Sequence, residues 1–274
     1  MGLRIATNIA SQSVQKNLKE VSNAGNTQLE KLSSGKRITK ASDDAAGLAI
    51  ATNLEAQTKG LRQASRNAND GVSLVQTAEG GLNETSNILI RLRELTIQAA
   101  SDTVGDQERG FLDKEYQQLT KEIDRISEST VFNGSQLLNG KGKGSMDFQV
   151  GAFAGEQNRI TFDSSETDSS ASSIGVAGTN ISNKDDALGS ISSIDKAIEK
   201  VSGQRANLGS IQSRLQSTIK NLEVQTINQD SARSVIQDVD VAEATAALSS
   251  NQVVKNAAVS TLAQANGIPN SALR

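Results

Sequence analysis

Two adjacent carboxylates, Asp43 and Asp44, are the residues of this 274-residue chain that most suggest general acid–base chemistry. Neighbouring positions on a helix do not face each other, so the two groups would not converge on one substrate atom. They follow Ser42, and carboxylates in such a position are typical of the first turn of a helix, where the helix dipole stabilises negative charge. We therefore expect helix initiation here and no catalysis.

A second candidate is the run 140–144, which has the sequence GKGKG. A phosphate-binding loop requires the spacing G-x-x-x-x-G-K-[ST], which this run lacks. Glycine-rich runs of this length are common in surface turns, and we expect such a turn.

The residue types needed for most site chemistry are missing, because the chain has no His and no Cys. Zinc sites and activated nucleophiles draw on these residues, and His is the commonest general acid or base. A metal site would have to rely on carboxylates, which favours Ca²⁺ or Mg²⁺. We predict no catalytic residue, no metal site and no cofactor, and hence a protein that is not an enzyme.

The charge and hydropathy patterns argue against two further classes. Net charge is −3, from 28 basic and 31 acidic residues, whereas nucleic-acid binding requires a clear basic excess. No apolar run approaches the ~20 residues of a membrane-spanning helix. The first residues, MGLRIATNIASQSVQKN, contain no apolar stretch typical of a secretory signal. We expect no nucleic-acid partner, no membrane insertion and no ordinary signal peptide.

Two long helical repeats would position any site. Within residues 46–100 an apolar residue recurs at every seventh position from Leu61 to Leu89, a pattern typical of a coiled-coil-like helix pair. The C-terminal third repeats in the same way, and Ile191, Ile198 and Ile219 are interpreted as its second track. The predicted heptad core is Leu61, Ala68, Val75, Leu82, Leu89, Ile194, Val201, Leu208, Leu215 and Leu222.

Shorter patterns complete the prediction. Apolar spacings of three and four indicate helices at about 5–33 and 107–128, and a last helix after Gln229–Asp230. We therefore predict a mainly α fold, a long antiparallel coiled-coil or helix-bundle rod built from the N- and C-terminal segments.

A small β-hairpin region is predicted at the centre of the chain. Met146–Val150 and Ile160–Phe162 alternate weakly between apolar and polar residues, which indicates a hairpin. The Ser-, Asp- and Gly-rich residues 163–186 are interpreted as a surface loop or an ordering-poor segment, with Ser164–Ser173 projecting outward.

Both ends are helical by pattern but poor in large apolar residues. All six aromatic residues lie between Phe111 and Phe162. Such ends bury too little apolar surface to offset their conformational entropy, so they need partners. Copies of one chain meeting head to tail would form a helical filament; a coiled-coil adaptor and a secreted translocator fit the same pattern. The predicted polymerisation residues are Ile5, Ile9, Val14, Leu18, Val241, Leu248, Val259 and Leu262.

Specific strings resemble those of a known family. LSSGKRITKASDDAAGLAIA at 32–51 and GLRQASRNANDGVSLVQTAEGGLNE at 60–84 resemble the N-terminal signature of bacterial flagellins, and QRANLGSIQSRLQSTIKNL at 204–222 resembles the C-terminal one. RLRELTIQA, FNGSQLL and DVDVAEATAAL fit the same order. The resemblance implies a structural subunit of the bacterial flagellar filament, exported unfolded through the flagellar channel, secreted, and serving swimming motility.

The resemblance also implies a domain division. Residues 1–45 and 235–274 would pair as inner-core helices that fold on assembly. Residues 46–139 and 187–234 would form a helical rod domain, and 140–186 would be a short β-hairpin and surface loop replacing the variable outer domains.

Partners are implied by the same resemblance. They are identical or related flagellin subunits, a filament cap, hook–filament junction proteins and an export chaperone on the C-terminal region. Arg91, Leu95 and Glu115 stand where flagellins contact the vertebrate flagellin-sensing Toll-like receptor. We expect them to serve receptor recognition of the monomer and subunit packing.

The sequence departs from the usual pattern of the family at two places, and three alternative classes of protein are considered. Val235 stands where family members usually carry arginine, and the chain stops at Arg274 where many relatives continue with leucines. A hook–filament junction protein shares the terminal helices but is expected to match poorly in NANDGVSL and QRANLG. A flagellin with an inserted protease domain would need a motif such as H-E-x-x-H, and a coiled-coil adaptor would form no filament.

Overall fold

The computed structural model describes residues 7–271, with side chains described to residue 267. This part of the chain contains six α-helices and two small antiparallel sheets, which confirms the predicted mainly α fold with a small β region. The elements are α1 (Ile9–Ser34), α2 (Ala45–Ala100), α3 (Asp106–Ser129), β1 (Val131–Phe132), β2 (Ser135–Gln136), β3 (Ser145–Gln149), a 3₁₀ turn η1 (Glu156–Asn158), β4 (Arg159–Asp163), α4 (Ala171–Ile174), α5 (Lys184–Gln237) and α6 (Val241–Ser271).

The chain divides into two compact units. The first takes in residues up to Thr58 and from Ile227 onward, and the second is Lys59–Thr226. Helices α2 and α5 each contribute residues to both units.

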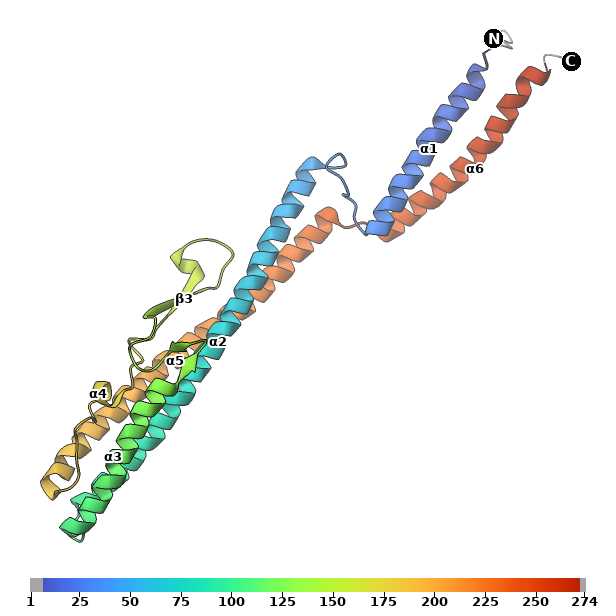
Figure 1. Ribbon diagram of the computed structural model, residues 1–274. Helices are drawn as coiled ribbons and strands as arrows, with labels where there is room; N and C mark the ends of the chain where they lie inside the picture. Colours follow the sequence, from blue (N-terminus) through green and yellow to red (C-terminus); the bar gives the residue numbers. More distant parts are fainter. Residues whose placement is uncertain (1–6, 272–274) are drawn as a thin grey trace. The chain divides into compact units, whose positions relative to one another are not determined.

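In the first unit α1 and α6 lie side by side and run antiparallel (Figure 1). At one end the Asn8 side chain donates to the carbonyl of Ala265 at 2.9 Å. At the other end the Arg37 N–H donates to the carbonyl of Gln237 at 2.7 Å. Asn8 also caps α1, since its side chain accepts from the backbone of Ser11, as the exposed amides of a helix start require.

In the second unit α2, α3 and α5 form an antiparallel bundle (Figure 1). Arg93 Nε on α2 pairs with Asp195 Oδ1 on α5 at 2.7 Å. Lys184 Nζ, at the start of α5, pairs with Asp102 Oδ1, just beyond the end of α2, at 2.6 Å. The core between them is mostly Leu, Ile, Val and Ala, which pack closely without needing polar partners.

Helix α5 runs further than the sequence indicated. The interpretation that a last helix begins after Gln229–Asp230 is wrong, because α5 continues to Gln237. Neither residue forces a helix to end, and the break falls at 238–240, where the Asp240 carboxylate accepts from the backbone of Ala242 at 2.8 Å. Val235 therefore lies in the last turn of α5 and not in α6.

The β region consists of two hairpins. Strands β3 and β4 pair with Met146 opposite Phe162 and Phe148 opposite Ile160, which is the hairpin that the alternation predicted. Strands β1 and β2 pair across Asn133–Gly134, where both residues have positive φ, +48° and +76°, as a two-residue hairpin turn requires.

Residues 164–183, called the strap, contact both α3 and α5: the Ala171 N–H donates to Asp124 Oδ1 on α3, and Lys200 Nζ on α5 donates to Ser173 O. The expectation that Ser164–Ser173 projects outward is wrong at Ser164, Thr167 and Ser169, which are all buried. Their polar groups are satisfied within the fold: Thr167 Oγ1 donates to Leu137 O at 2.8 Å and the Ser169 N–H donates to Leu138 O at 2.9 Å. Ile174, Val176 and Ile181 then reach the apolar core.

Candidate assembly surfaces

The two carboxylates that suggested catalysis serve the backbone. Asp43 Oδ2 accepts from the N–H groups of Thr39 and Lys40 at 3.0 and 3.1 Å. These bonds lower the pKa of Asp43, and the bond from Thr39 has the largest effect. Asp44 lies one residue before α2 begins, and its Oδ1 accepts from the Gly47 N–H at 2.8 Å. The two side chains thus shape a turn and cap a helix.

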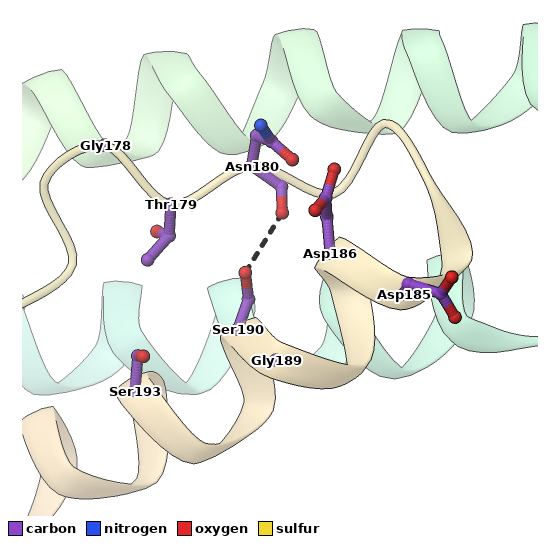
Figure 2. Close-up of a pocket in the computed structure, with 8 residues that line it drawn as sticks. All are labelled: Gly178, Thr179, Asn180, Asp185, Asp186, Gly189, Ser190 and Ser193. Carbon is purple, nitrogen blue, oxygen red and sulfur yellow. Dashed lines mark hydrogen bonds between the residues drawn. The ribbon is translucent and has the colours of Figure 1, made fainter.

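A shallow hollow of about 230 Å³ lies where the strap meets the start of α5 (Figure 2). Asp185 and Asp186 border it, and Ser190 Oγ donates across it to the carbonyl of Asn180 at 3.0 Å. Within residues 7–271 no three His, Cys, Asp or Glu side chains are grouped so that they could hold a metal ion.

The ten predicted heptad residues are all buried, each exposing 4% or less. Leu61 and Leu222 pack together with Ala64 in one cluster, and the others belong to the larger core. The second track on α5 lies one position away from the one inferred: Ser190, Ala197, Gln204 and Ile211 are buried, while Ile191, Ile198 and Ile219 are only half-buried.

Arg91 and Glu115 form an exposed ion pair between α2 and α3. Arg91 Nη2 and Nε donate to the same oxygen, Glu115 Oε1, at 2.8 and 3.1 Å, and Nη1 donates to Glu94 Oε2 at 3.0 Å. These bonds raise the pKa of Arg91, and the bond with Glu115 has the largest effect. Half of the Arg91 side chain is exposed, so the cluster presents fixed charge of both signs to solvent.

Leu95, predicted beside this pair, is buried at 1% exposure in the core between the helices. Leu95 therefore offers no surface to a receptor, and only Arg91 and Glu115 of the three are accessible. Glu94, the second partner of Arg91, was not singled out in the sequence, although its place three residues after an arginine is a recognised helix pairing.

Helices α1 and α6 have almost no core of their own. Among their described side chains only Ser11, Ala244 and Ala265 are buried. Ile9, Val241 and Val259 are at least half exposed, and the remaining predicted residues, Val14, Leu18, Leu248 and Leu262, are half-buried. Ile5 and Arg274 lie outside the described residues.

Uncovered apolar side chains are frequent in this first unit. Besides the three above, the large apolar residues that expose more than two fifths of their surface are Leu29, Ile50, Ile227, Val235, Val253 and Val254. A helix pair that buries one serine and two alanines while exposing a set of Ile, Leu and Val side chains has the character of an incomplete interface.

Two side chains make hydrogen bonds that the sequence did not indicate. Arg109 is buried and donates to the carbonyls of Ala99 and Ser101. Tyr116 is buried beneath the strap and bonds Thr179 Oγ1 at 2.6 Å. Tyr116 belongs to the apolar spacing that predicted the helix at 107–128. The bonding partners of both side chains could not be inferred locally, because they are backbone groups or residues distant in sequence.

These features define a mainly helical protein in which α1 and α6 bury little of their own surface. No helix in the described part of the chain is long and apolar enough to cross a membrane. Family models match nearly all of the helical sequence: the bacterial flagellin N-terminal helical region over residues 5–143 and the C-terminal helical region over residues 191–274. The chain belongs to the bacterial flagellin family.

Relatives and a solved structure agree. The chain is 41% identical to a flagellin of Halalkalibacterium halodurans over 97% of both chains, and 37% identical to a flagellar filament core protein of Treponema maltophilum over 87% of both. It also resembles the crystal structure of Bacillus cereus flagellin, with a TM-score of 0.51 and 33% identity over 57% of this chain and 88% of that one. The protein is a structural, non-enzymatic subunit that assembles with related subunits into the flagellar filament.

A putative hook-associated protein of Vibrio parahaemolyticus also shares the fold. Its TM-score is 0.59 at 17% identity, and the match covers 71% of this chain and 99% of that one. At this identity the likeness concerns the fold alone. The family match at both ends therefore favours a flagellin over the junction-protein alternative.

Proposed function

We propose that α1 and α6 acquire a stable core only when the filament forms around them. The supporting observation is their lack of buried large side chains, since only Ser11, Ala244 and Ala265 are buried in the described part of the pair. Ordering more than fifty residues costs more conformational entropy than so small a contact returns. Neighbouring subunits would supply the missing apolar contact, so folding of the ends and polymerisation are coupled.

The proposed arrangement follows the three-part division of the sequence. Residues 1–45 with 235–274 line the inner core, 46–139 with 187–234 form the rod, and 140–186 replace the outer domains. Contacts between subunits are head to tail and do not close, which gives a helical filament. The filament serves swimming.

Delivery is proposed to follow the flagellar route. The subunit passes unfolded through the flagellar channel and is secreted, and a chain without cysteine cannot form a disulfide that would obstruct this passage. An export chaperone on the C-terminal region, hook–filament junction proteins and a filament cap are the proposed partners besides related subunits.

Deleting Val235–Arg274 tests the coupling. We expect the truncated chain to remain soluble when filament seeds are added, and to show lower helicity than the full chain. Sedimentation measures polymer, and circular dichroism measures helicity. The second unit serves as the internal control, because Tyr116 lies in it and should stay buried. Seeded filaments of the truncated chain would refute the proposal.

We further propose that the free subunit is recognised by the vertebrate flagellin-sensing Toll-like receptor through Arg91 and Glu115. Arg91→Ala should weaken signalling in receptor-bearing reporter cells. Arg125→Ala is the matched control, because Arg125 is also an exposed arginine paired within three residues, to Glu122. Equal signalling by the wild-type subunit and both variants would contradict the proposal.

A further inference from the structure

Three Asn–Gly pairs occur in this chain, at 133–134, 139–140 and 266–267. An Asn–Gly pair is chemically labile, because glycine has no side chain to obstruct attack by its backbone nitrogen on the asparagine amide. The structure places the three pairs in different surroundings, so their reactivities should differ.

Asn133 is the least restrained of the three. It is the only non-glycine residue with positive φ in the described chain, at +48°, and it occupies an exposed two-residue turn. Within residues 7–271 its side chain makes no hydrogen bond. Gly134 is equally open, since a Cβ placed there would meet no atom within 4 Å.

Asn139 is held at both ends of its amide. Its Nδ2 donates to Gln136 Oε1 at 2.6 Å, and its Oδ1 accepts from the Lys141 N–H at 3.0 Å. The Asp168 carboxylate also lies beside Gly140, with Oδ2 2.9 Å from the position of a Cβ. This negative charge opposes deprotonation of the Gly140 nitrogen.

We propose that Asn133 is a site of spontaneous deamidation and that the fold protects Asn139. The Gly134 backbone nitrogen loses its proton and attacks Asn133 Cγ, which forms a five-membered succinimide and expels the amide nitrogen as ammonia. Water then opens the ring at either carbonyl, giving aspartate or isoaspartate. The balance is one water consumed and one ammonia released, with no oxidant or reductant.

The product changes the turn as well as the charge. Isoaspartate adds one carbon to the backbone between Phe132 and Gly134, so a two-residue turn no longer matches the β1–β2 register. The Leu137 N–H donates to Thr130 O at 3.1 Å directly beside this turn, and Leu137 is fully buried. Formation of isoaspartate should therefore disturb the backbone next to a buried core residue.

Comparing Asn133 with Asn139 does not depend on assembly, because both lie in the second unit. Asn266 is different: its side chain accepts from Ser11 Oγ in the α1–α6 pair, whose order is proposed to depend on the filament. The experiment therefore uses the soluble full-length subunit and leaves Asn266 out of the comparison.

The test is incubation of the folded subunit at mildly alkaline pH, followed by tryptic digestion and fragment-ion mass spectrometry. Both asparagines fall on one tryptic peptide, residues 126–141, so digestion and ionisation affect them equally. Asn139 can react only after hydrogen bonds of ordinary net strength to its amide are broken. We therefore expect Asn133 to convert about tenfold faster than Asn139. Equal conversion, or faster conversion of Asn139, would overturn the proposal.

Two controls separate the fold from the sequence. In guanidinium chloride Asn133 and Asn139 should convert at similar rates. If Asn133 still converted faster there, the folded structure would not be the cause of the difference in rate. Asn133→Gly keeps a residue that favours this turn, and it should abolish isoaspartate at 133 while leaving the Asn139 rate unchanged.

Discussion

Arg109 lies across the end of α2, and its Nε atom donates to the carbonyl oxygen of Ala99 at 2.8 Å. Its Nη2 donates to Ser101 O at 2.9 Å and its Nη1 to Asp106 Oδ1 at 2.7 Å. The last carbonyls of a helix lack partners within the helix, and here one buried guanidinium satisfies two carbonyls at and just beyond the end of α2 while joining α2 to α3.

We therefore expect Arg109→Lys to lower the free energy of unfolding by about 1–3 kcal/mol, because an ammonium cannot reproduce the fork and leaves a buried carbonyl unpaired. Urea unfolding followed by circular dichroism measures the change. Arg125→Lys, at an exposed arginine of the same helix, should leave the unfolding midpoint nearly unchanged. A similar midpoint shift for both variants would argue against this role of Arg109.

Gly80 and Gly81 are neighbours on α2 with opposite surroundings. A Cβ at Gly80 would meet nothing within 4 Å, whereas one at Gly81 would lie 2.6 Å from Leu138 Cδ1 and 2.7 Å from Thr130 Oγ1. Gly80→Ala should raise the free energy of unfolding by about 0.5–1 kcal/mol through helix propensity. Gly81→Ala should lower it by about 1 kcal/mol, since crowding outweighs propensity. Equal stabilisation by both variants in urea unfolding would contradict this, because it would mean that Leu138 and Thr130 move aside at little cost.

Tyr116 should make stability fall at alkaline pH. Burial raises the pKa of its phenol above the ordinary value of 10.0, although the bond to Thr179 opposes this. The unfolded chain releases the proton near pH 10 and the folded chain retains it, so the contribution is complete below that pH and is lost as pH rises through the folded pKa.

The single tyrosine allows a direct measurement. Phenolate absorbance should appear at higher pH in the folded chain than in guanidinium chloride. Tyr116→Phe should flatten the dependence of unfolding free energy on pH above pH 10, with Lys and Arg titration common to both proteins. Identical alkaline slopes for the variant and the wild type would rule out Tyr116 as the source.

The heptad positions were visible in the sequence because a seven-residue spacing of large apolar residues needs no knowledge of the partner helix. The second track of α5 was displaced by one residue because Ser190, Ala197 and Gln204 are small or polar and carry no apolar signal, yet all are buried. The flanking isoleucines gave the stronger but misleading pattern.

The strap could not be predicted from composition. Its polar residues resemble a loop, but its backbone is fixed by side chains distant in sequence: Asp124 Oδ1 accepts from the Ala171 N–H at 2.8 Å, and Asp113 Oδ1 from the Ile181 N–H at 3.0 Å. Arg91 and Glu115 were singled out only through resemblance, because no spacing rule joins residues on two helices.

Val253 should be a contact in the assembled filament. It lies near the middle of α6 and exposes 69% of its surface, so replacing it should affect assembly more than the free subunit. Burying a valine against a neighbouring subunit contributes about 1.5 kcal/mol, and Val253→Ser should therefore raise the critical concentration for seeded polymerisation about tenfold. Sedimentation of filaments at graded subunit concentrations measures it. Asn256→Ser, at another exposed position of α6, is the matched control, and an unchanged critical concentration for Val253→Ser would mean that this face of α6 stays in solvent.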